Sequence, residues 1–141
     1  MKNKNTQIVL VLLSSFIILI GYGHGIGPIV LLSLMWFITP FTDGDIEVFK
    51  NFTLIGDYND VIPSVTILFF IGFLILLSAI FIKHSFGKSW FVYIGIVLML
   101  LGYLFLIIPF DNGLRVLSGV SGIPFALLSV KLILETKKAE V

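Results

Sequence analysis

The sequence predicts an all-α integral membrane protein: a bundle of four helical spans with an extra outer-leaflet half-helix and a short acidic extracytoplasmic cap. Two observations predict this class. Only 12% of the 141 residues are charged and 58% are hydrophobic, whereas a soluble domain carries about 25% charged residues. Three apolar runs also reach the roughly 20 residues that a helix needs to cross a bilayer. Most of the surface must therefore face lipid, and one domain over 1–141 accounts for the length.

The three clear spans cover 61–82, 90–110 and 114–134, and turn or charge signals bound each of them. Asn59 and Asp60 precede the first, and Asp111-Asn112-Gly113 separates the last two. Pro124 predicts a kink within the last span, because proline removes a backbone hydrogen bond. We therefore expect three straightforward crossings, the last of them bent.

The first apolar segment, 8–38, is harder to assign, because as one helix it would be about 46 Å long. That is too long for one crossing and too short for two. We expect one span over 7–25 and a half-helix over 28–38 that lies against the outer leaflet and ends at Pro40. Lys2 and Lys4 before an apolar run also fit a signal peptide. Hydrophobicity resumes directly after the glycines, which favours an uncleaved anchor.

Charge gives the orientation, since loops rich in Lys and Arg stay cytoplasmic. With four spans, Lys50 and Arg115 lie on one side of the membrane and the other seven basic residues lie on the opposite side. Both termini are then cytoplasmic, and the location that we expect is a bacterial inner membrane. Trp90 and Tyr93 fit an inner aromatic belt at the start of the third span.

A glycine group interrupts the first segment and forms the candidate ligand or packing site. Gly21 with Gly25, and Gly23 with Gly27, are Gly-x-x-x-Gly pairs that let helices pack closely in lipid, and Pro28 follows them. A close-packed face with a kink is one interpretation. The other is a ligand-lined break at which Tyr22, His24 and Tyr103 meet. A span separates His24 from His84, so we expect the two histidines to share no haem or metal. We also expect no cofactor and no catalytic residue in this chain.

Small residues in the other spans predict packing between helices: Gly72, Ser78, Gly95, Gly102 and the pair Ser118 and Gly122. The outer loop 39–60 carries five carboxylates and predicts a short amphipathic helix over the end of the bundle. Asp43, Asp45 and Glu47 form a candidate partner face. They do not match an EF-hand, which needs Gly and Glu where Val48 and Leu54 stand. Asn51 starts a glycosylation acceptor tripeptide.

Within the predicted spans, Arg115 and Lys131 lie near the ends and can snorkel to the interface; no other charged residue falls inside. This argues against a proton-coupled transporter, a pump or an intramembrane hydrolase. Asp111 and Arg115 stand four residues apart at the outer turn, which fits a pair at a helix start rather than a catalytic couple. The absence of cysteine excludes thiolate metal sites and cysteine nucleophiles. A formal net charge of +1 excludes bulk attraction to nucleic acid.

The resulting functional hypothesis is a non-enzymatic membrane subunit or binding module. In the lipid bilayer it would engage a membrane protein partner, a second copy of itself, a lipid or an apolar ligand. The alternatives are a small oligomeric channel or transporter, and a redox-linked membrane subunit.

The four spans and the run Ile18-Leu19-Ile20-Gly21-Tyr22-Gly23-His24 resemble small bacterial DoxX-like membrane proteins. In that family the first span ends in a glycine-rich turn with a polar residue. The arginine often found at the start of that span is missing here. The resemblance implies a compact four-span fold, and some members are linked to oxidoreductase partners. It assigns no functional residue to this chain.

The topology can be tested with single cysteines, because the chain has none of its own. We expect Asn51→Cys to react with an impermeant thiol reagent in intact cells and Ser85→Cys to stay unlabelled until the cells are opened. Seven basic residues on the cytoplasmic side predict this pattern. Labelling in the reverse order would contradict the four-span topology.

Overall fold

The computed structural model describes residues 4–22, 25–43, 52–108 and 111–138. These residues are mostly helical, and they form six α-helices and one two-stranded hairpin. The expected all-α class is therefore correct for most of the chain and wrong for the hairpin. The elements are α1 (Lys4–Ser15), β1 (Leu19–Tyr22), β2 (Gly25–Pro28), α2 (Ile29–Asp43), α4 (Tyr58–Ser78), α5 (Ser85–Ile107), α6 (Gly113–Ser121) and α7 (Ile123–Lys138).

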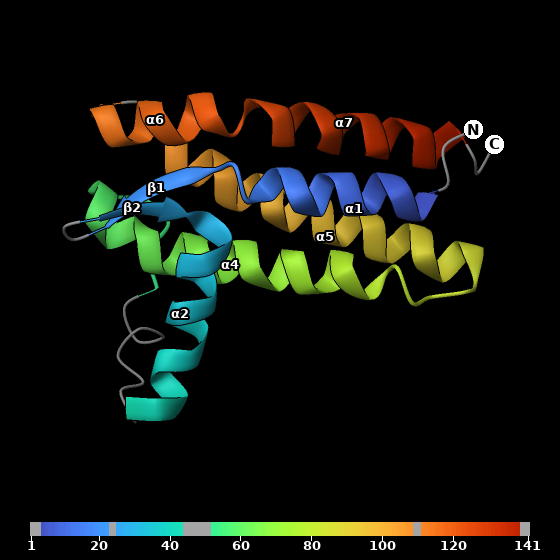
Figure 1. The fold of residues 1–141 in the computed structure, drawn as a ribbon, viewed down its shortest axis with the longest axis horizontal. Helices are drawn as coiled ribbons and strands as arrows, with labels where there is room; N and C mark the ends of the chain where they lie inside the picture. Colours follow the sequence, from blue (N-terminus) through green and yellow to red (C-terminus); the bar gives the residue numbers. More distant parts are fainter. Residues whose placement is uncertain (1–3, 23–24, 44–51, 109–110, 139–141) are drawn as a thin grey trace.

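Four columns run side by side along the long axis of the molecule (Figure 1). Two of them, α4 and α5, are each long and apolar enough to cross a membrane by themselves. A third column consists of α6 and α7, which pass the same test together and meet at an angle of 46°. Gly122 separates them, two residues before Pro124, so the predicted kink in the last span is confirmed. The fourth column contains α1 followed by β1.

The first column differs from the expected helix over 7–25. Helix α1 ends at Ser15, and β1 then pairs antiparallel with β2 in the register Leu19 to Pro28 and Tyr22 to Gly25. Glycine is about 1 kcal/mol less favourable than alanine in a helix, so the glycine group weakens helix continuation. Helix α1 is only about 18 Å long, and the four residues of β1 add about 13 Å. The column thereby reaches a length similar to that of its neighbours.

A strand inside an apolar bundle needs partners along both edges, because buried N–H and C=O groups are costly to leave unpaired. One edge of β1 pairs with β2, and Ile18 O accepts from Ile29 N at 2.9 Å. Along the other edge, Leu19 N donates to Ser121 Oγ at 2.9 Å and Leu19 O accepts from Ser118 Oγ at 2.7 Å. These two side chains of α6 supply the hydrogen-bond partners that a third strand would supply. Ser118 was expected only to pack, and it also binds the hairpin.

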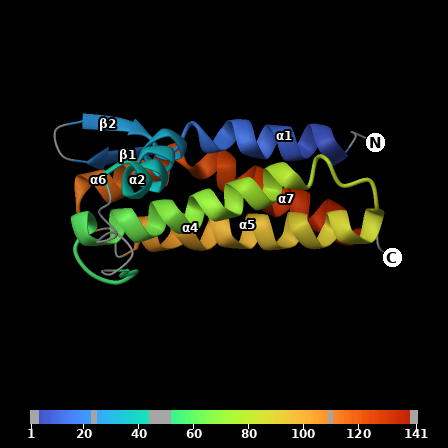
Figure 2. The same ribbon diagram turned by 90° about the horizontal axis from the view of Figure 1, so that it is seen from below.

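Helix α2 leaves the hairpin and runs crosswise to the four columns (Figures 1 and 2). We expected a half-helix over 28–38 that ends at Pro40, but α2 continues through Pro40 to Asp43. Proline in the last turn removes only one intrahelical hydrogen bond, so the helix can pass it. Near its start, Ile29 and Ser33 are fully buried. An apolar stripe on α2 stays exposed; it consists of Leu31, Leu34, Met35 and Ile38.

Glycines allow α4 and α5 to approach backbone to backbone. A Cβ built on Gly72 would lie 2.8 Å from Gly95 O, and one on Gly95 would lie 2.8 Å from Leu76 N. At Gly102 the nearest atom would be Val65 O, at 3.2 Å. The first two distances are too short for any side chain. The predicted packing role of these three glycines is confirmed.

The bonds from α6 to β1 lead to a test by side-chain deletion. We expect Ser118→Ala with Ser121→Ala to lower the free energy of unfolding by about 1–3 kcal/mol, because Leu19 loses both partners. Ser78→Ala is the matched control. Ser78 was expected to pack between helices, but it is exposed, and its hydroxyl donates to Leu74 O of the same helix. Unfolding in mixed micelles measures both. Equal, small effects would show that the serines do not hold the strand.

Candidate functional site

Arg115, in the first turn of α6, is the most buried charged side chain among the described residues, with 1% of its surface exposed. Its Nη2 donates to Gly56 O at 2.8 Å and its Nη1 donates to Ile108 O. The Nε atom lies 2.9 Å from Asp111 Oδ1, in an ion pair whose alignment is not that of a hydrogen bond. Arg115 was expected to snorkel to the interface, and that prediction is wrong. The backbone carbonyls of Gly56 and Ile108 bind the guanidinium inside the protein instead.

Local sequence explains why α6 presents Arg115 in this way. Asn112 is the N-cap residue of α6, and its Oδ1 accepts from Arg115 N at 2.9 Å. The helix therefore begins at Gly113, two residues before Arg115, and the four-residue spacing places Asp111 beside the guanidinium. The predicted pair of Asp111 and Arg115 at this helix start is confirmed.

Tyr58 connects Arg115 to the hairpin. The guanidinium carbon lies 5.7 Å from the centre of the Tyr58 ring, a cation–π distance. The Tyr58 hydroxyl oxygen accepts from Gly21 N at 3.1 Å, on the same edge of β1 that α6 binds through Leu19. Three elements far apart in sequence are thus joined at one end of the molecule: β1, the start of α4 and the start of α6.

An open, apolar groove of about 620 Å³ lies next to this network. One wall is the segment before α4, and the other is the last two turns of α5. The lining residues are Leu54, Ile55, Gly56, Leu101, Leu104, Phe105 and Ile108. Arg115 binds the carbonyl oxygens of Gly56 and Ile108, one from each wall, and so holds the two walls together. Gly56 has φ +153°, a conformation that favours glycine.

The groove was missed from the sequence, although part of its signal is visible there. Leu101, Leu104, Phe105 and Ile108 recur at the spacing of one helix face. Any lipid-facing helix shows the same spacing, so the pattern alone does not identify a binding surface. The second wall comes from a connecting segment whose position only the fold reveals.

The predicted glycine site is divided among different environments. Gly21 is buried, and a Cβ there would lie 2.7 Å from Leu114 Cδ2. Gly25 is exposed with no atom within 4 Å of such a Cβ, and Gly27 approaches only Leu32 of α2, at 3.8 Å. The expected close packing of Gly25 against a neighbouring helix is therefore wrong, because the glycines lie in strands. Pro28 ends β2, opposite Leu19.

Tyr103 extends from α5 and contacts both α6 and α7. Its hydroxyl donates to Gly119 O at 2.6 Å, and a side chain at Gly122 would overlap its ring. Gly122 therefore packs as predicted, against Tyr103. The tyrosine supports the bend between α6 and α7, and the hairpin binds the same short helix through Ser118 and Ser121.

Several predicted residues lie outside the part of the chain that the structure describes: Gly23, His24, Asp45, Glu47, Asn51 and most of the predicted amphipathic helix of the outer loop. Asp43 is the last residue of α2. The ligand role of the glycine group and the partner role of the acidic face stay predictions. Within the described ranges, no group of three or more His, Asp or Glu side chains could hold a metal ion.

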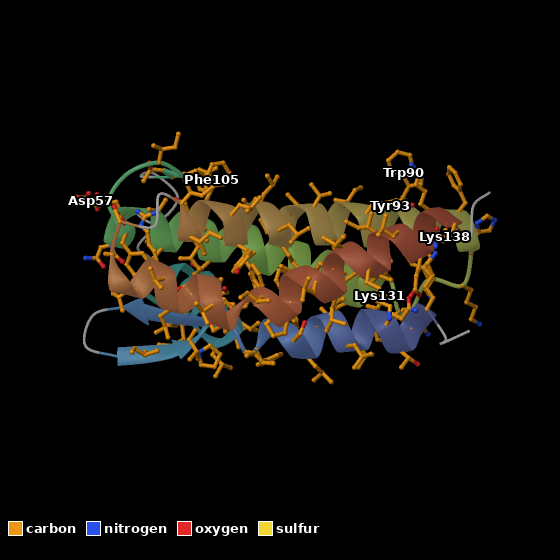
Figure 3. The ribbon with its side chains drawn as sticks, turned by 90° about the horizontal axis from the view of Figure 1, so that it is seen from above. Asp57, Trp90, Tyr93, Phe105, Lys131 and Lys138 are labelled. Atoms are coloured by element: carbon orange, nitrogen blue, oxygen red, sulfur yellow. The ribbon has the colours of Figure 1, made fainter. Side chains whose placement is uncertain are left out.

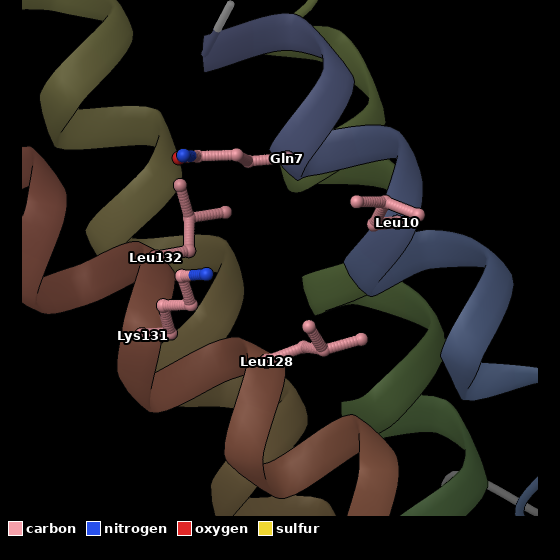
Figure 4. A pocket seen from close by; sticks show the side chains of 5 residues that line it. All are labelled: Gln7, Leu10, Leu128, Lys131 and Leu132. Carbon is pink, nitrogen blue, oxygen red and sulfur yellow. The ribbon is translucent and has the colours of Figure 1, made fainter. Parts of the chain in front are cut away.

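A smaller hollow of about 60 Å³ lies at the other end of the molecule, between α1 and α7 (Figure 4). Its lining residues are Gln7, Leu10, Leu128, Lys131 and Leu132. The polar groups at its rim already have partners. Gln7 Nε2 donates to Glu135 Oε2, and Lys131 Nζ lies 3.9 Å from Glu135 Oε1. This hollow is therefore a weaker candidate for a binding site than the groove.

The bridging role of Arg115 can be separated from its ion pair. We expect Arg115→Met to lower the free energy of unfolding by about 2–5 kcal/mol, since two buried carbonyls lose a charged donor. Asp111→Asn should lower it by only about 0–1 kcal/mol, because the carboxylate is half exposed. Titration with a denaturing detergent measures both. Equal losses would assign the stabilisation to the ion pair.

Comparison with protein-family models, curated proteins and solved structures finds no match to this chain. The resemblance to DoxX-like proteins therefore stays a prediction. The candidate site rests on its own geometry: an apolar groove with two walls, bridged by a buried arginine.

Proposed function

We propose that this chain is a non-enzymatic integral membrane protein that binds the acyl chain of a lipid in the groove between 54–56 and α5. The observation that carries the proposal is the lining of that groove by seven residues without a polar side chain. Three of them, Leu101, Leu104 and Phe105, lie on α5, a helix long enough to span a bilayer. The proposal includes four crossings, with both ends of the chain on the cytoplasmic side of a bacterial inner membrane.

The distribution of apolar side chains supports a membrane setting. Large apolar residues are exposed on all the columns, among them Leu13 of α1, Leu74 of α4, Val97 of α5 and Leu127 of α7. In water such surfaces promote association, whereas lipid covers them at no cost. Two or three helices have the length and composition to cross. The first column would cross as α1 and β1, with the backbone of β1 paired inside the protein.

The crosswise direction of α2 supports the same setting. If the columns run along the membrane normal, α2 lies in the membrane plane at the level of the hairpin (Figure 2). Its exposed apolar stripe then faces the outer leaflet. This matches the half-helix expected from the sequence and leaves the groove accessible from the lipid.

The position of the groove favours a lipid chain over a water-soluble ligand. Leu101, Leu104 and Ile108 are 39%, 44% and 56% exposed, so the groove is open along the outer side of α5. In a bilayer, that side faces acyl chains. Arg115 binds the carbonyl oxygens of Gly56 and Ile108, one in each wall, so neither residue presents an unpaired acceptor to an apolar ligand. Burial of each methylene contributes about 0.8 kcal/mol.

Photocrosslinking in lipid nanodiscs tests the groove. We expect a phosphatidylcholine with a diazirine in its acyl chain to label peptides containing 101–108 and 54–56 more than the rest of the lipid-facing surface. Leu104→Trp, which fills the groove, should reduce this labelling about fivefold or more, in line with the loss of a few methylene contacts.

Val97→Trp is the matched control, because Val97 is 47% exposed on the same helix face but lies outside the groove. It should leave labelling of 101–108 unchanged. Equal labelling along the whole of α5, or equal effects of the two variants, would contradict a binding groove. A protein crosslinked to the groove in native membranes would assign it to a partner instead.

A further inference from the structure

Charge is unevenly distributed between the two ends of the molecule. Asp57 lies at the end with the groove, whereas Lys131 and Lys138 lie toward the opposite end (Figure 3). The basic end collects lysines from three of the columns: Lys4 of α1, Lys83 and Lys88 around the start of α5, and Lys131, Lys137 and Lys138 of α7. Among the described residues, Glu135 is the single carboxylate there.

Four of these lysines, Lys83, Lys88, Lys137 and Lys138, are exposed at the surface or contact a neutral group. Lys88 Nζ donates to Asn5 Oδ1, and Lys4 Nζ donates to Ser89 Oγ at 3.0 Å. These two acceptors are neutral. The Glu135 carboxylate contacts Gln7 and Lys131 beside the hollow between α1 and α7. Lys83, Lys137 and Lys138 are exposed at the surface. The positive field is therefore strongest around the start of α5 and the end of α7.

Aromatic side chains lie beside the lysines at this end. Trp90 is 55% exposed, and its ring packs edge-on against Phe86 at a centroid distance of 6.3 Å. Tyr93 lies near Trp90 in Figure 3. Trp and Tyr near a helix end favour the headgroup region of a bilayer. Lys88 is two residues before Trp90 on the same helix, so it lies next to these aromatic side chains.

We propose that this basic end binds the headgroups of anionic phospholipids in the leaflet around it, with Lys83, Lys88, Lys137 and Lys138 as the binding residues. The proposal goes beyond the acyl-chain groove, since it concerns the opposite end and a different chemistry. The positive charge of the lysines selects an anionic ligand. The neighbouring Trp90 and Tyr93 favour a lipid headgroup over an acidic protein as the source of that anion. Glu135 opposes binding, because its carboxylate repels phosphate.

Tryptophan fluorescence can report this binding locally. The chain has two tryptophans, so Trp36→Phe leaves Trp90 as the only reporter. In proteoliposomes, brominated phosphatidylglycerol should quench Trp90 more efficiently than brominated phosphatidylcholine at low salt. The preference should largely disappear in 1 M salt, where the screening length is about 3 Å. The Trp90→Phe chain, which reports from Trp36 in α2, is the control and should show no preference.

Lysine variants in the Trp36→Phe background test the assignment. Lys83→Gln with Lys88→Gln should reduce the anionic preference at Trp90 roughly threefold or more, and the amide that Lys88→Gln introduces can still donate to Asn5. Glu135→Gln should increase the preference. Lys50→Gln, in the segment between α2 and α4, should leave it unchanged. No preference at low salt would overturn the proposal, as would a preference that survives the double lysine variant. Competition by a polyglutamate peptide without any lipid preference would assign the surface to an acidic protein, and would also overturn it.

Discussion

The structure depends on satisfying the backbone of one strand that lies inside an apolar bundle. β1 continues the column that α1 begins, and a strand cannot pair its own N–H and C=O groups as a helix does. The hairpin pairs one edge, and Ser118 and Ser121 bind Leu19 on the other. A serine hydroxyl both donates and accepts, so two neighbouring serines can serve the N–H and the C=O of one residue. The position of α6 beside β1 follows from this requirement.

The same requirement links the hairpin to the groove. The Tyr58 hydroxyl accepts from Gly21 N on the edge of β1 that also binds α6, and the Tyr58 ring lies 5.7 Å from the guanidinium carbon of Arg115. Arg115 then joins the two groove walls through Gly56 and Ile108. A guanidinium has five donors in a rigid plane, so it can serve two carbonyls and a carboxylate together. One network thus holds the strand, the start of α4 and the groove walls in a single arrangement.

The two ends of the molecule present different chemistry. One end has the buried arginine, the hairpin and an apolar groove, while the other has exposed lysines beside Trp90 and Tyr93. If a bilayer surrounds the columns as proposed, it offers acyl chains along the sides of the molecule and charged headgroups at its ends. The crosswise α2 adds an exposed apolar stripe. These features support the proposal that the protein interacts with lipid.

From the sequence alone, hydropathy and length located α4, α5 and the α6–α7 column, the glycines between α4 and α5, and the bend near Pro124. Each of these depends on local composition or spacing. The hairpin was not predictable, because a short apolar run with glycines fits a helix or a strand equally well. Its partners Ser118 and Ser121 lie about 100 residues away along the chain. Arg115 shows its pairing with Asp111 by spacing, but its bond to Gly56 joins residues 59 positions apart. Only the tertiary structure could decide these features, because contacts between distant segments determine which buried polar groups find partners.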